Sequence, residues 1–389
     1  MKVKIYNIGW IFSILFVILL TSCMSTSQFE DYANVRNLTF KENGKDLRDS
    51  TFFKSRTVIP LETNDLALIG HIDRIYMADN RYFILDQNFR NILIYDKDGK
   101  YVNSIKKVGQ GPKEYVDLGD ICIDRVNKEL LVLCTRPSKV QFYNYQGKFL
   151  REKSLENKYY SQFTTDGKYL YFLDDARINQ NKVIAIYDRK LNHQTDVLEY
   201  GKTFKTDEPG TVYKFAKGNT MTQDSTIHFV LDYDNIVYEA KNGEVYPKYR
   251  LDFKQHTLPE NLLDGQIKSF KFLDVCRDKQ YVISVKEVIE NSKNLLFTTN
   301  LGLFRCDKQS GEIIGHSFLL DSTLGIGSSD ILVVGNSNKV AVVWPVARLK
   351  NMFKTELKNL QDASVKEDFL KKLSKMDEEN NSILFVYEL

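Results

Sequence analysis

The stretch Ile94-Tyr95-Asp96-Lys97-Asp98-Gly99-Lys100 recurs along this chain and decides its fold. Apolar and aromatic residues lead into an Asp-Gly turn, which is the strongest short signal for a β-hairpin. Looser copies occur at similar phase, so the turn indicates a repeated unit rather than one isolated hairpin. The copies lie at residues 142–148, 186–192, 237–244 and 304–312.

Strand signals surround every copy of the turn. They are segments of ~4 to 8 residues rich in Ile, Val, Tyr and Phe, separated by Asp, Asn or Gly. They group into units of about 45 to 70 residues, which fits four-stranded propeller blades and is too long for leucine-rich or ankyrin repeats. We therefore predict an all-β fold, a six-bladed β-propeller over residues 51–389. The units are 56–105, 119–152, 159–198, 213–253, 269–320 and 330–389.

The last unit shows three strand signals, and Leu389 stands where a turn into a fourth strand would begin. The early strand signal at 56–63 has no unit of its own. We expect it to pair with the last strand and close the fold, because this removes a free sheet edge. Pro60 suits an outermost strand because it cannot donate to a ladder.

Residues 346–377 break the strand pattern. Apolar residues recur there at helical spacing on Lys- and Glu-rich segments, which predicts a small helical insertion in the last blade. It is either a structural cap or a partner-binding lid. The apolar positions are Leu349, Phe353, Leu357, Leu360, Phe369, Leu370, Leu373 and Met376.

Residues 1–22 are predicted to be a lipoprotein signal peptide. Lys2 and Lys4 precede an apolar run at 11–20 that is shorter than the ~20 residues a membrane-spanning helix needs. An ordinary secretory signal and an uncleaved anchor are the alternatives. Residues 23–50 are polar and are predicted to be a tether.

Leu20-Thr21-Ser22-Cys23 resembles a bacterial lipobox, which implies lipidation at Cys23. Acyl chains each contribute about 0.8 kcal/mol per buried methylene, so they would hold the protein firmly at the membrane. Met24 rather than Asp follows Cys23, which favours the outer membrane of the cell envelope. Whether the protein faces the periplasm or the cell surface stays open.

Composition limits the classes of partner. The chain has 389 residues, and its apolar fraction of 43% is enough for a sizeable core. Removing Lys2 and Lys4 takes the formal charge from +3 to +1, which is no basic field for nucleic acid. We expect a monomer that does not bind nucleic acid.

The stretch Gly109-Gln110-Gly111-Pro112-Lys113-Glu114-Tyr115 contains two glycines but does not match the pattern of a phosphate-binding loop. Pro112 removes an amide, and Glu114 would repel an anion. We predict that 106–118 connects the outer strand of the first unit to the inner strand of the second. Glu114 and Tyr115 either hold this connection by hydrogen bonds or form a ligand mouth with Gly109 and Gly111.

Several stretches resemble the six-bladed β-propeller lipoproteins of Bacteroides and relatives. The resemblance spans about 55–389, and it implies an NHL-like propeller on an envelope lipoprotein that acts as a recognition module. It supplies no catalytic motif, and this chain has Asn380-Asn381-Ser382 where the family usually shows Asp-Asn-Pro. The matching stretches are Ile59-Pro60-Leu61-Glu62-Thr63, Leu68-Ile69-Gly70, Tyr82-Phe83-Ile84-Leu85-Asp86, the Gly109 to Tyr115 stretch and Asn380-Asn381-Ser382-Ile383-Leu384.

Metal-binding patterns are sparse. The histidines show no HxH or HExxH spacing, so we expect them at the surface or across strands. Carboxylates near strand ends could converge on the channel as Ca²⁺ ligands; otherwise no cofactor is expected. The histidines are His71, His193, His228, His256 and His316, and the carboxylates are Asp117, Asp120, Asp174, Asp175, Asp232 and Asp234.

The remaining cysteines are expected to be free, buried thiols. The hairpin register places Cys122 opposite about Leu131, so Cys134 is left without a direct partner. Cys276 and Cys306 are expected on the first and third strands of one unit, with another strand between them.

Two classes of function follow. The favoured one is a lipid-anchored recognition module for a glycan, peptide or protein partner, with aromatics such as Tyr115, Tyr160, Tyr213 and Tyr233 at its face. The alternative is an envelope hydrolase or lyase with a metal in the channel. No catalytic residue can be named for it.

Overall fold

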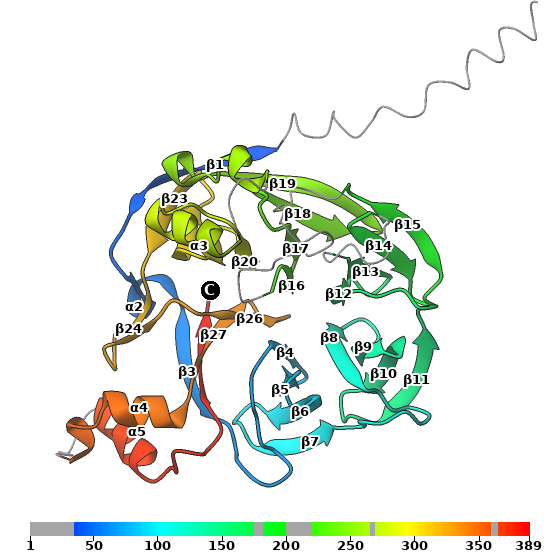
Figure 1. Ribbon diagram of the computed structural model, residues 1–389. Coiled ribbons are helices and arrows are strands. Elements are labelled where there is room, and N and C mark those ends of the chain that lie inside the picture. The colour runs from blue at the N-terminus through cyan, green and yellow to red at the C-terminus, as the bar shows by residue number, and fades with distance from the viewer. Residues whose placement is uncertain (1–34, 175–181, 200–218, 265–268, 359–364) are drawn as a thin grey trace, which may run out of the picture.

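The structure, a computed structural model, describes residues 35–174, 182–199, 219–264, 269–358 and 365–389. These residues are mostly β-strand with few helices, so the all-β prediction is confirmed. Antiparallel meanders are arranged around a common centre (Figure 1). No helix within the described residues is long and apolar enough to cross a membrane. The predicted signal peptide 1–22 and Cys23 lie outside the described residues.

The first three meanders run from the centre of the ring to its rim (Figure 1). In each of them neighbouring strands pair antiparallel and in chain order. Their strands are β4 (Arg74–Ala78), β5 (Arg81–Asp86), β6 (Asn91–Asp96), β7 (Tyr101–Ile105), β8 (Asp117–Asp124), β9 (Glu129–Arg136), β10 (Ser138–Asn144), β11 (Phe149–Ser154), β12 (Gln162–Thr165), β13 (Tyr169–Leu173), β14 (Ile184–Asp188) and β15 (His193–Val197).

The fourth and fifth meanders are joined by an N-terminal strand, which corrects the prediction of a polar tether over 23–50. Strand β1 (Arg36–Asn43) runs parallel to the outermost strand of each meander and unites them into one sheet. Leu38 and Phe40 alternate on its buried side, a period-2 signal too short to stand out among polar neighbours. The other strands are β16 (Met221–Gln223), β17 (Ile227–Val230), β18 (Ile236–Lys241), β19 (Glu244–Asp252), β20 (Val285–Glu290), β21 (Asn294–Thr299), β22 (Gly302–Asp307) and β23 (Glu312–His316).

The closing meander contains strands from both ends of the described chain. Its order is β26 (Leu332–Gly335), β27 (Lys339–Trp344), β28 (Ile383–Glu388) and β3 (Ser55–Pro60). Ile59 pairs with Leu384 and Ser55 with Glu388, which confirms the predicted pairing of the early strand with the last one. Strand β26 also pairs with β4, and a side chain on Gly335 would overlap the Tyr76 ring at this contact.

The recurring turn joins the third strand of a meander to the fourth, as predicted. Asp96 Oδ1 accepts the N–H groups of Asp98 and Lys100, both at 2.9 Å. Gly99 has a φ of +82°, which favours glycine. Asn144 and Asp188 accept the same pair of N–H bonds in the second and third meanders.

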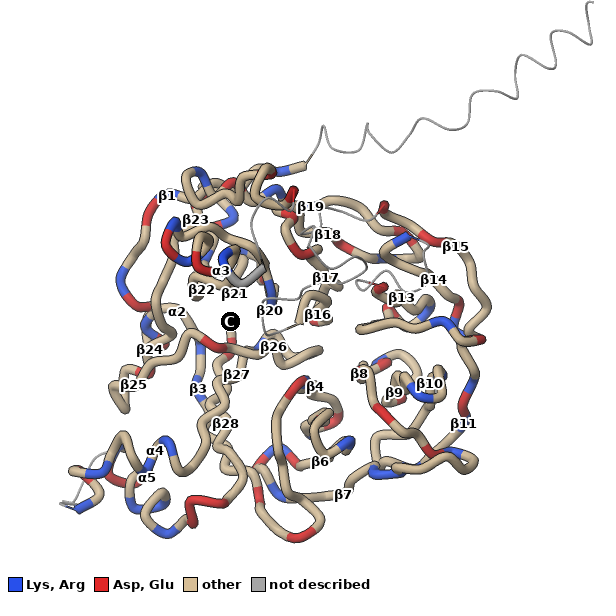
Figure 2. The backbone as a smooth tube through the Cα atoms, in the orientation of Figure 1, with Lys and Arg blue, Asp and Glu red and all other residues tan. Residues whose placement is uncertain are grey.

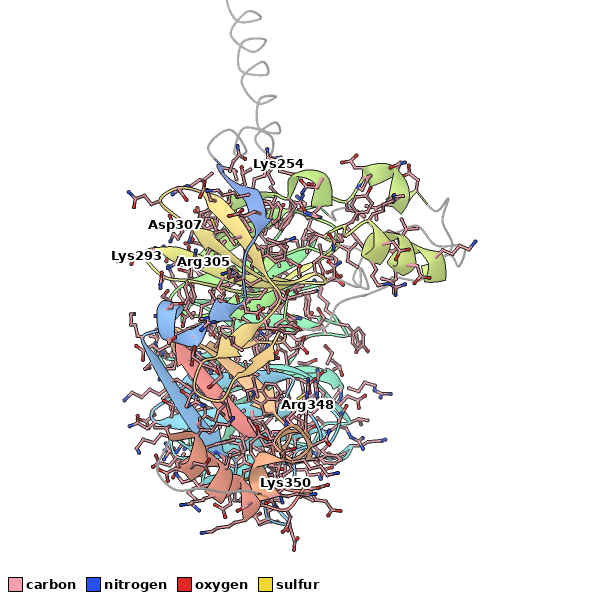
Figure 3. All side chains as sticks on the ribbon, turned by 90° about the vertical axis from the view of Figure 1, so that its left-hand side faces the viewer. Lys254, Lys293, Arg305, Asp307, Arg348 and Lys350 are labelled. Carbon is pink, nitrogen blue, oxygen red and sulfur yellow. The ribbon has the colours of Figure 1, made fainter. Side chains whose placement is uncertain are left out.

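Helical segments lie between the strands. The strand signal expected from residue 269 is wrong, because Phe272 and Cys276 are one helical turn apart and both are buried on α3. Cys276 is therefore on a helix rather than on a first strand. Seen edge-on, the yellow-green helical segment before β20 stands out from one face of the ring (Figure 3). The helices are α2 (Asp49–Phe52), η2 (Lys254–His256), η3 (Glu260–Leu263), α3 (Ser269–Asp278), α4 (Val346–Met352), η4 (Glu356–Lys358) and α5 (Val365–Ser374), and the remaining short strands are β2 (Leu47–Arg48), β24 (Leu319–Asp321) and β25 (Ile326–Ser328).

Helices α4 and α5 lie between β27 and β28, in the range where helical spacing was expected. They bury Leu349, Leu370 and Leu373 in the same apolar cluster as Trp344 and Phe385. Figure 3 shows Arg348 and Lys350 on this part of the ring. This packing is that of a cap on the closing meander.

Candidate functional site

The centre of the ring holds a buried ion pair. Arg74, at the start of β4, is 4% exposed and Asp120 of β8 is 2% exposed. The guanidinium binds the carboxylate through Nε–Oδ1 and Nη2–Oδ2, both at 2.9 Å. Its remaining donors reach Met221 O of β16 at 2.5 Å and Gln162 Oε1 of β12 at 3.1 Å. One side chain therefore links the inner strands of four meanders.

The Asp120 carboxylate also accepts two backbone bonds. The N–H of Ile121 lies 2.8 Å from Oδ1, and that of Phe163 lies 3.0 Å from Oδ2. Burial raises the pKa of Asp120, and the Arg74 guanidinium and these N–H groups counter the rise. Of the carboxylates that could have converged on the channel, Asp120 lies at the inner strands. Its carboxylate is paired with the Arg74 guanidinium.

Glu287 connects the remaining inner strands. It lies in a bulge of β20 with a φ of +50°, an uncommon conformation for a residue with a side chain. Its carboxylate accepts the N–H groups of Asn219 at 2.6 Å and of Val333, in β26, at 2.7 Å. Burial raises the pKa of Glu287, and these bonds partly offset the rise. We call Arg74, Asp120 and Glu287 the central hub.

The other carboxylates predicted near the channel do not join the central hub. Asp117 pairs with the exposed Arg136, and Asp232 lies 2.9 Å from Lys286 Nζ. Asp174 and Asp234 lie on loops after other strands, and Asp175 falls outside the described residues. The described aspartates therefore form no shared Ca²⁺ site.

One group of side chains within the described residues has the ligand types of a metal site. His228 Nε2 lies 3.2 Å from Glu290 Oε1, and Glu239 is close to both. Lys248, however, binds both carboxylates, and Lys308 Nζ lies 2.9 Å from Glu290 Oε2. Burial alone raises the pKa of Glu290, but bonds and charges from His228, Lys248 and Lys308 hold it well below its usual range. The group is an ion-pair network joining the fourth and fifth meanders.

The other histidines, and the aromatic residues expected at a ligand-binding face, make contacts within the protein or lie in its core. His71 lies 3.7 Å from Asp73, His193 lies 2.7 Å from Asp196, and His256 packs edge-on against Phe40. His316 Nδ1 contacts Lys45 O, and burial lowers its pKa. Tyr213 falls outside the described residues, whereas Tyr115, Tyr160 and Tyr233 are buried in the core.

The cysteines of the described chain are free and buried, as predicted. Cys122 pairs with Leu131 across the β8–β9 hairpin, which is the expected register. Burial raises the pKa of Cys134 to about 12, so its thiol is unreactive at neutral pH.

The Gly109 to Tyr115 stretch connects β7 to β8, as predicted. Tyr115 is fully buried, and its hydroxyl lies 2.9 Å from Ile105 O and 3.0 Å from Arg90 O. Glu114 Oε2 accepts the Gly111 N–H at 2.7 Å. A side chain on Gly109 would overlap the Glu114 carboxylate. Glu114 and Tyr115 therefore stabilise the connection by hydrogen bonds. Because Tyr115 is fully buried, it is not accessible to a ligand.

An exposed apolar surface lies beside this connection. We call Leu66, Leu68, Phe89 and Val108 the Phe89 patch; their exposed fractions are 69%, 48%, 46% and 40%. They come from the connection into β4, the β5–β6 turn and the connection into β8. Since β4 and β5 are antiparallel, all three segments lie at the end of the first meander where β4 begins. Sequence reasoning missed Phe89, although an aromatic residue inside the polar turn 87–90 was a usable signal.

Cations surround the Phe89 patch. Lys106 Nζ lies 5.9 Å from the centre of the Phe89 ring, and Arg90 donates to Val116 O at 3.2 Å. Lys107 and Lys113 are also exposed on the connection into β8. Basic and acidic residues occur on every meander (Figure 2). In the segments that carry the patch, the cations are the more exposed of the two.

Two cavities of a size that suits small ligands open elsewhere. One, of about 360 Å³, lies between the start of β18 and the end of β19 and includes Asp234, Arg250 and Asp252. The other, of about 310 Å³, lies where the turns after β4, β8 and β26 meet. Both have mixed charges in their walls.

Comparison with known proteins gives a family and a fold. The family model described as Domain of unknown function (DUF4934) matches residues 34–388. A crystal structure of a protein from Bacteroides fragilis NCTC 9343, described as exported, is 19% identical with a TM-score of 0.70 and covers 90% of this chain and 99% of that one. A DUF4221 family member from Bacteroides vulgatus is 10% identical with a TM-score of 0.46 and covers 86% and 97%. No curated protein matches the chain. The family match begins just before β1, so this strand belongs to the domain.

Proposed function

This chain belongs to the family described as Domain of unknown function (DUF4934), and we propose that it is a recognition module of the bacterial cell envelope. Its scaffold is a six-bladed β-propeller whose last blade is closed by β3. Support for the propeller comes from the meanders, each of which starts at the centre and ends at the rim (Figure 1). The partner is a glycan, peptide or protein, and the module acts as a monomer.

A lipid at Cys23 would place the module at the outer membrane. The support is the Leu20-Thr21-Ser22-Cys23 stretch, together with the structural likeness to a Bacteroides fragilis protein described as exported. Since β1 begins at Arg36, residues 24–35 would form the tether. At ~3.4 Å per residue they span at most about 40 Å, enough to hold the ring near the bilayer.

The observation that supports recognition is the position of the Phe89 patch. Monomeric proteins seldom expose several large apolar side chains together, and such groups mark interaction sites. The ring centre, in contrast, holds the central hub, in which Arg74 pairs with Asp120 and Glu287 accepts backbone N–H groups. The exposure of the Phe89 patch therefore favours the end of the first meander as the place where a ligand binds.

The alternative of a hydrolase or lyase with a channel metal has no comparable support. The carboxylates near the channel that it would use already have partners: Asp120 has Arg74, Asp117 has Arg136 and Asp232 has Lys286.

Two variants test the proposal in living cells. Cys23→Ser should move the protein from the membrane fraction to the soluble fraction, and an unchanged distribution would refute the anchor. A photo-crosslinking residue at position 89 should give a discrete adduct that is absent when the residue is placed at Leu150, an exposed apolar position on β11. Identical patterns from both positions would refute recognition at this face.

A further inference from the structure

The Phe89 patch is continuous across its three segments. A side chain on Gly70 would sit 3.2 Å from the Phe89 ring, so the connection into β4 lies against the β5–β6 turn. Lys106 reaches the same ring from the connection into β8, and Val108 bridges to Tyr115 within that connection. The segments that carry Leu68, Phe89 and Val108 therefore lie side by side at this end of the first meander.

The segments under the Phe89 patch are held in place before any partner arrives. Asp86 Oδ1 accepts the Phe89 N–H at 3.0 Å, and Asp86 Oδ2 accepts the Gly70 N–H at 2.6 Å. Asn381 Oδ1 accepts the Ile69 N–H at 3.0 Å. Because the backbone is fixed by these bonds, a partner would lose little affinity to ordering of the patch.

The charge around the Phe89 patch selects the chemistry of the partner. Arg90, Lys106 and Lys107 are exposed, and none of these three forms an ion pair with a carboxylate of the described chain. Lys113 Nζ, in contrast, lies 5.1 Å from the centre of the Phe149 ring on β11, away from Phe89. The same three segments also contain four carboxylates. Asp65 is exposed, whereas Glu62, Asp73 and Glu114 are half-buried and accept the N–H groups of Tyr101, Gln87 and Gly111. Opposite charge across an interface raises the association rate and discriminates among partners.

Resting on the proposed function, we infer that the Phe89 patch binds an acidic segment of a protein partner, with an apolar side chain against Phe89 and carboxylates against Lys106, Lys107 and Arg90. A second copy of this chain is a poor occupant, because a two-fold contact would set these cations against themselves. The lipid surface is also a poor occupant, because β1, which follows the tether, lies on the opposite side of the ring from the first meander (Figure 1).

The test uses the mature, lipidated protein in detergent micelles and a fluorescein-labelled peptide that alternates Glu with Leu and Phe. The matched probe has Lys in place of every Glu. We expect the acidic peptide to bind saturably and the basic peptide not to bind. Phe89→Ala should weaken binding at least tenfold, which is about 1.4 kcal/mol. Lys106→Glu with Lys107→Glu should abolish it, and added salt should weaken it in the wild type.

Leu150→Ala and Lys148→Glu are the matched controls, because both residues are exposed on the second meander, away from the patch. They should leave binding unchanged, and thermal melts should show that all variants fold. Equal binding of both peptides, or no loss in Phe89→Ala, would overturn the inference. The inference would also be overturned if the patch bound phosphatidylglycerol vesicles or an acidic glycan instead of the peptide. Dimerisation of the protein through the patch would overturn it as well. If the acidic peptide did not bind but a residue at position 89 still gave a crosslink in cells, the acidic partner would be refuted. The proposed recognition function would not be.

Discussion

The guanidinium of Arg74 binds the carboxylate of Asp120 side-on at the centre of the ring, with both N–O distances at 2.9 Å. Neither residue is more than 4% exposed. Two charges buried at this depth are tolerated because each has its partner and further hydrogen bonds. The pair therefore ties the inner strands of four meanders together at the centre of the ring.

Replacing one member of this pair should be costly. Arg74→Met leaves Asp120 buried without its counter-charge, and we expect the free energy of unfolding to fall by about 3–5 kcal/mol. Urea denaturation followed by tryptophan fluorescence measures it. Arg81→Ala is the control, because Arg81 pairs at the surface with the exposed Asp79 and should cost less than about 1 kcal/mol. Equal, small losses in both variants would show that the central hub does not stabilise the ring.

The strand that closes the ring gives a second prediction. Ile59 is 2% exposed and pairs with Leu384, so Ile59→Ala should lower the free energy of unfolding by about 2–5 kcal/mol. Thr57, on the same strand, is exposed, and Thr57→Ala should change stability by no more than about 0.5 kcal/mol. If the two variants melt alike, the pairing of β3 with β28 contributes little.

Strand β1 gives a third prediction. Leu38 is fully buried between the fourth and fifth meanders, and Leu38→Ala should cost about 2–5 kcal/mol. Its neighbour Asn37 is exposed, so Asn37→Ala should be close to neutral. Residues 36–43 would be a tether after all if Leu38→Ala left the unfolding transition unchanged.

Glu290 gives a prediction about pH. Its pKa is lowered in the folded protein, whereas an unfolded Glu titrates near 4.3. The ionised group therefore stabilises the fold fully above about pH 5, and this contribution is lost as pH falls through the unfolded value toward the folded one. The difference in unfolding free energy between wild type and Glu290→Gln should narrow below pH 5. A difference independent of pH would contradict the ion-pair account of the His228 group.

Local sequence signals predicted the strand architecture well. The turn at Asp96 and Gly99 needs a carboxylate acceptor and a glycine at fixed spacing, so it is visible without any tertiary information. The pairing of β3 with β28 followed from an unassigned strand signal and an unfilled sheet edge. The turn depends on hydrogen bonds between residues close in sequence, and the pairing could be inferred from the number of strands in each unit.

The features that the sequence did not predict depend on tertiary contacts. Leu38 and Phe40 show an alternation only two residues long, and the neighbouring strands are what make it a β-strand. Phe272 and Cys276 are apolar residues at a spacing that also occurs in strand-rich segments. Asp120 was one of six carboxylates that could have converged on the channel, and the sequence near it gives no sign that Arg74 is its partner, because 46 residues separate them.

The most direct test of the account is hydrogen–deuterium exchange of the mature protein with and without the acidic peptide. We predict that the peptide slows exchange in residues 61–73, 87–90 and 106–116 and leaves β4, β8 and β20, which hold the central hub, unchanged. Slower exchange confined to those inner strands, with no change in the three surface segments, would place the ligand at the ring centre and contradict the account.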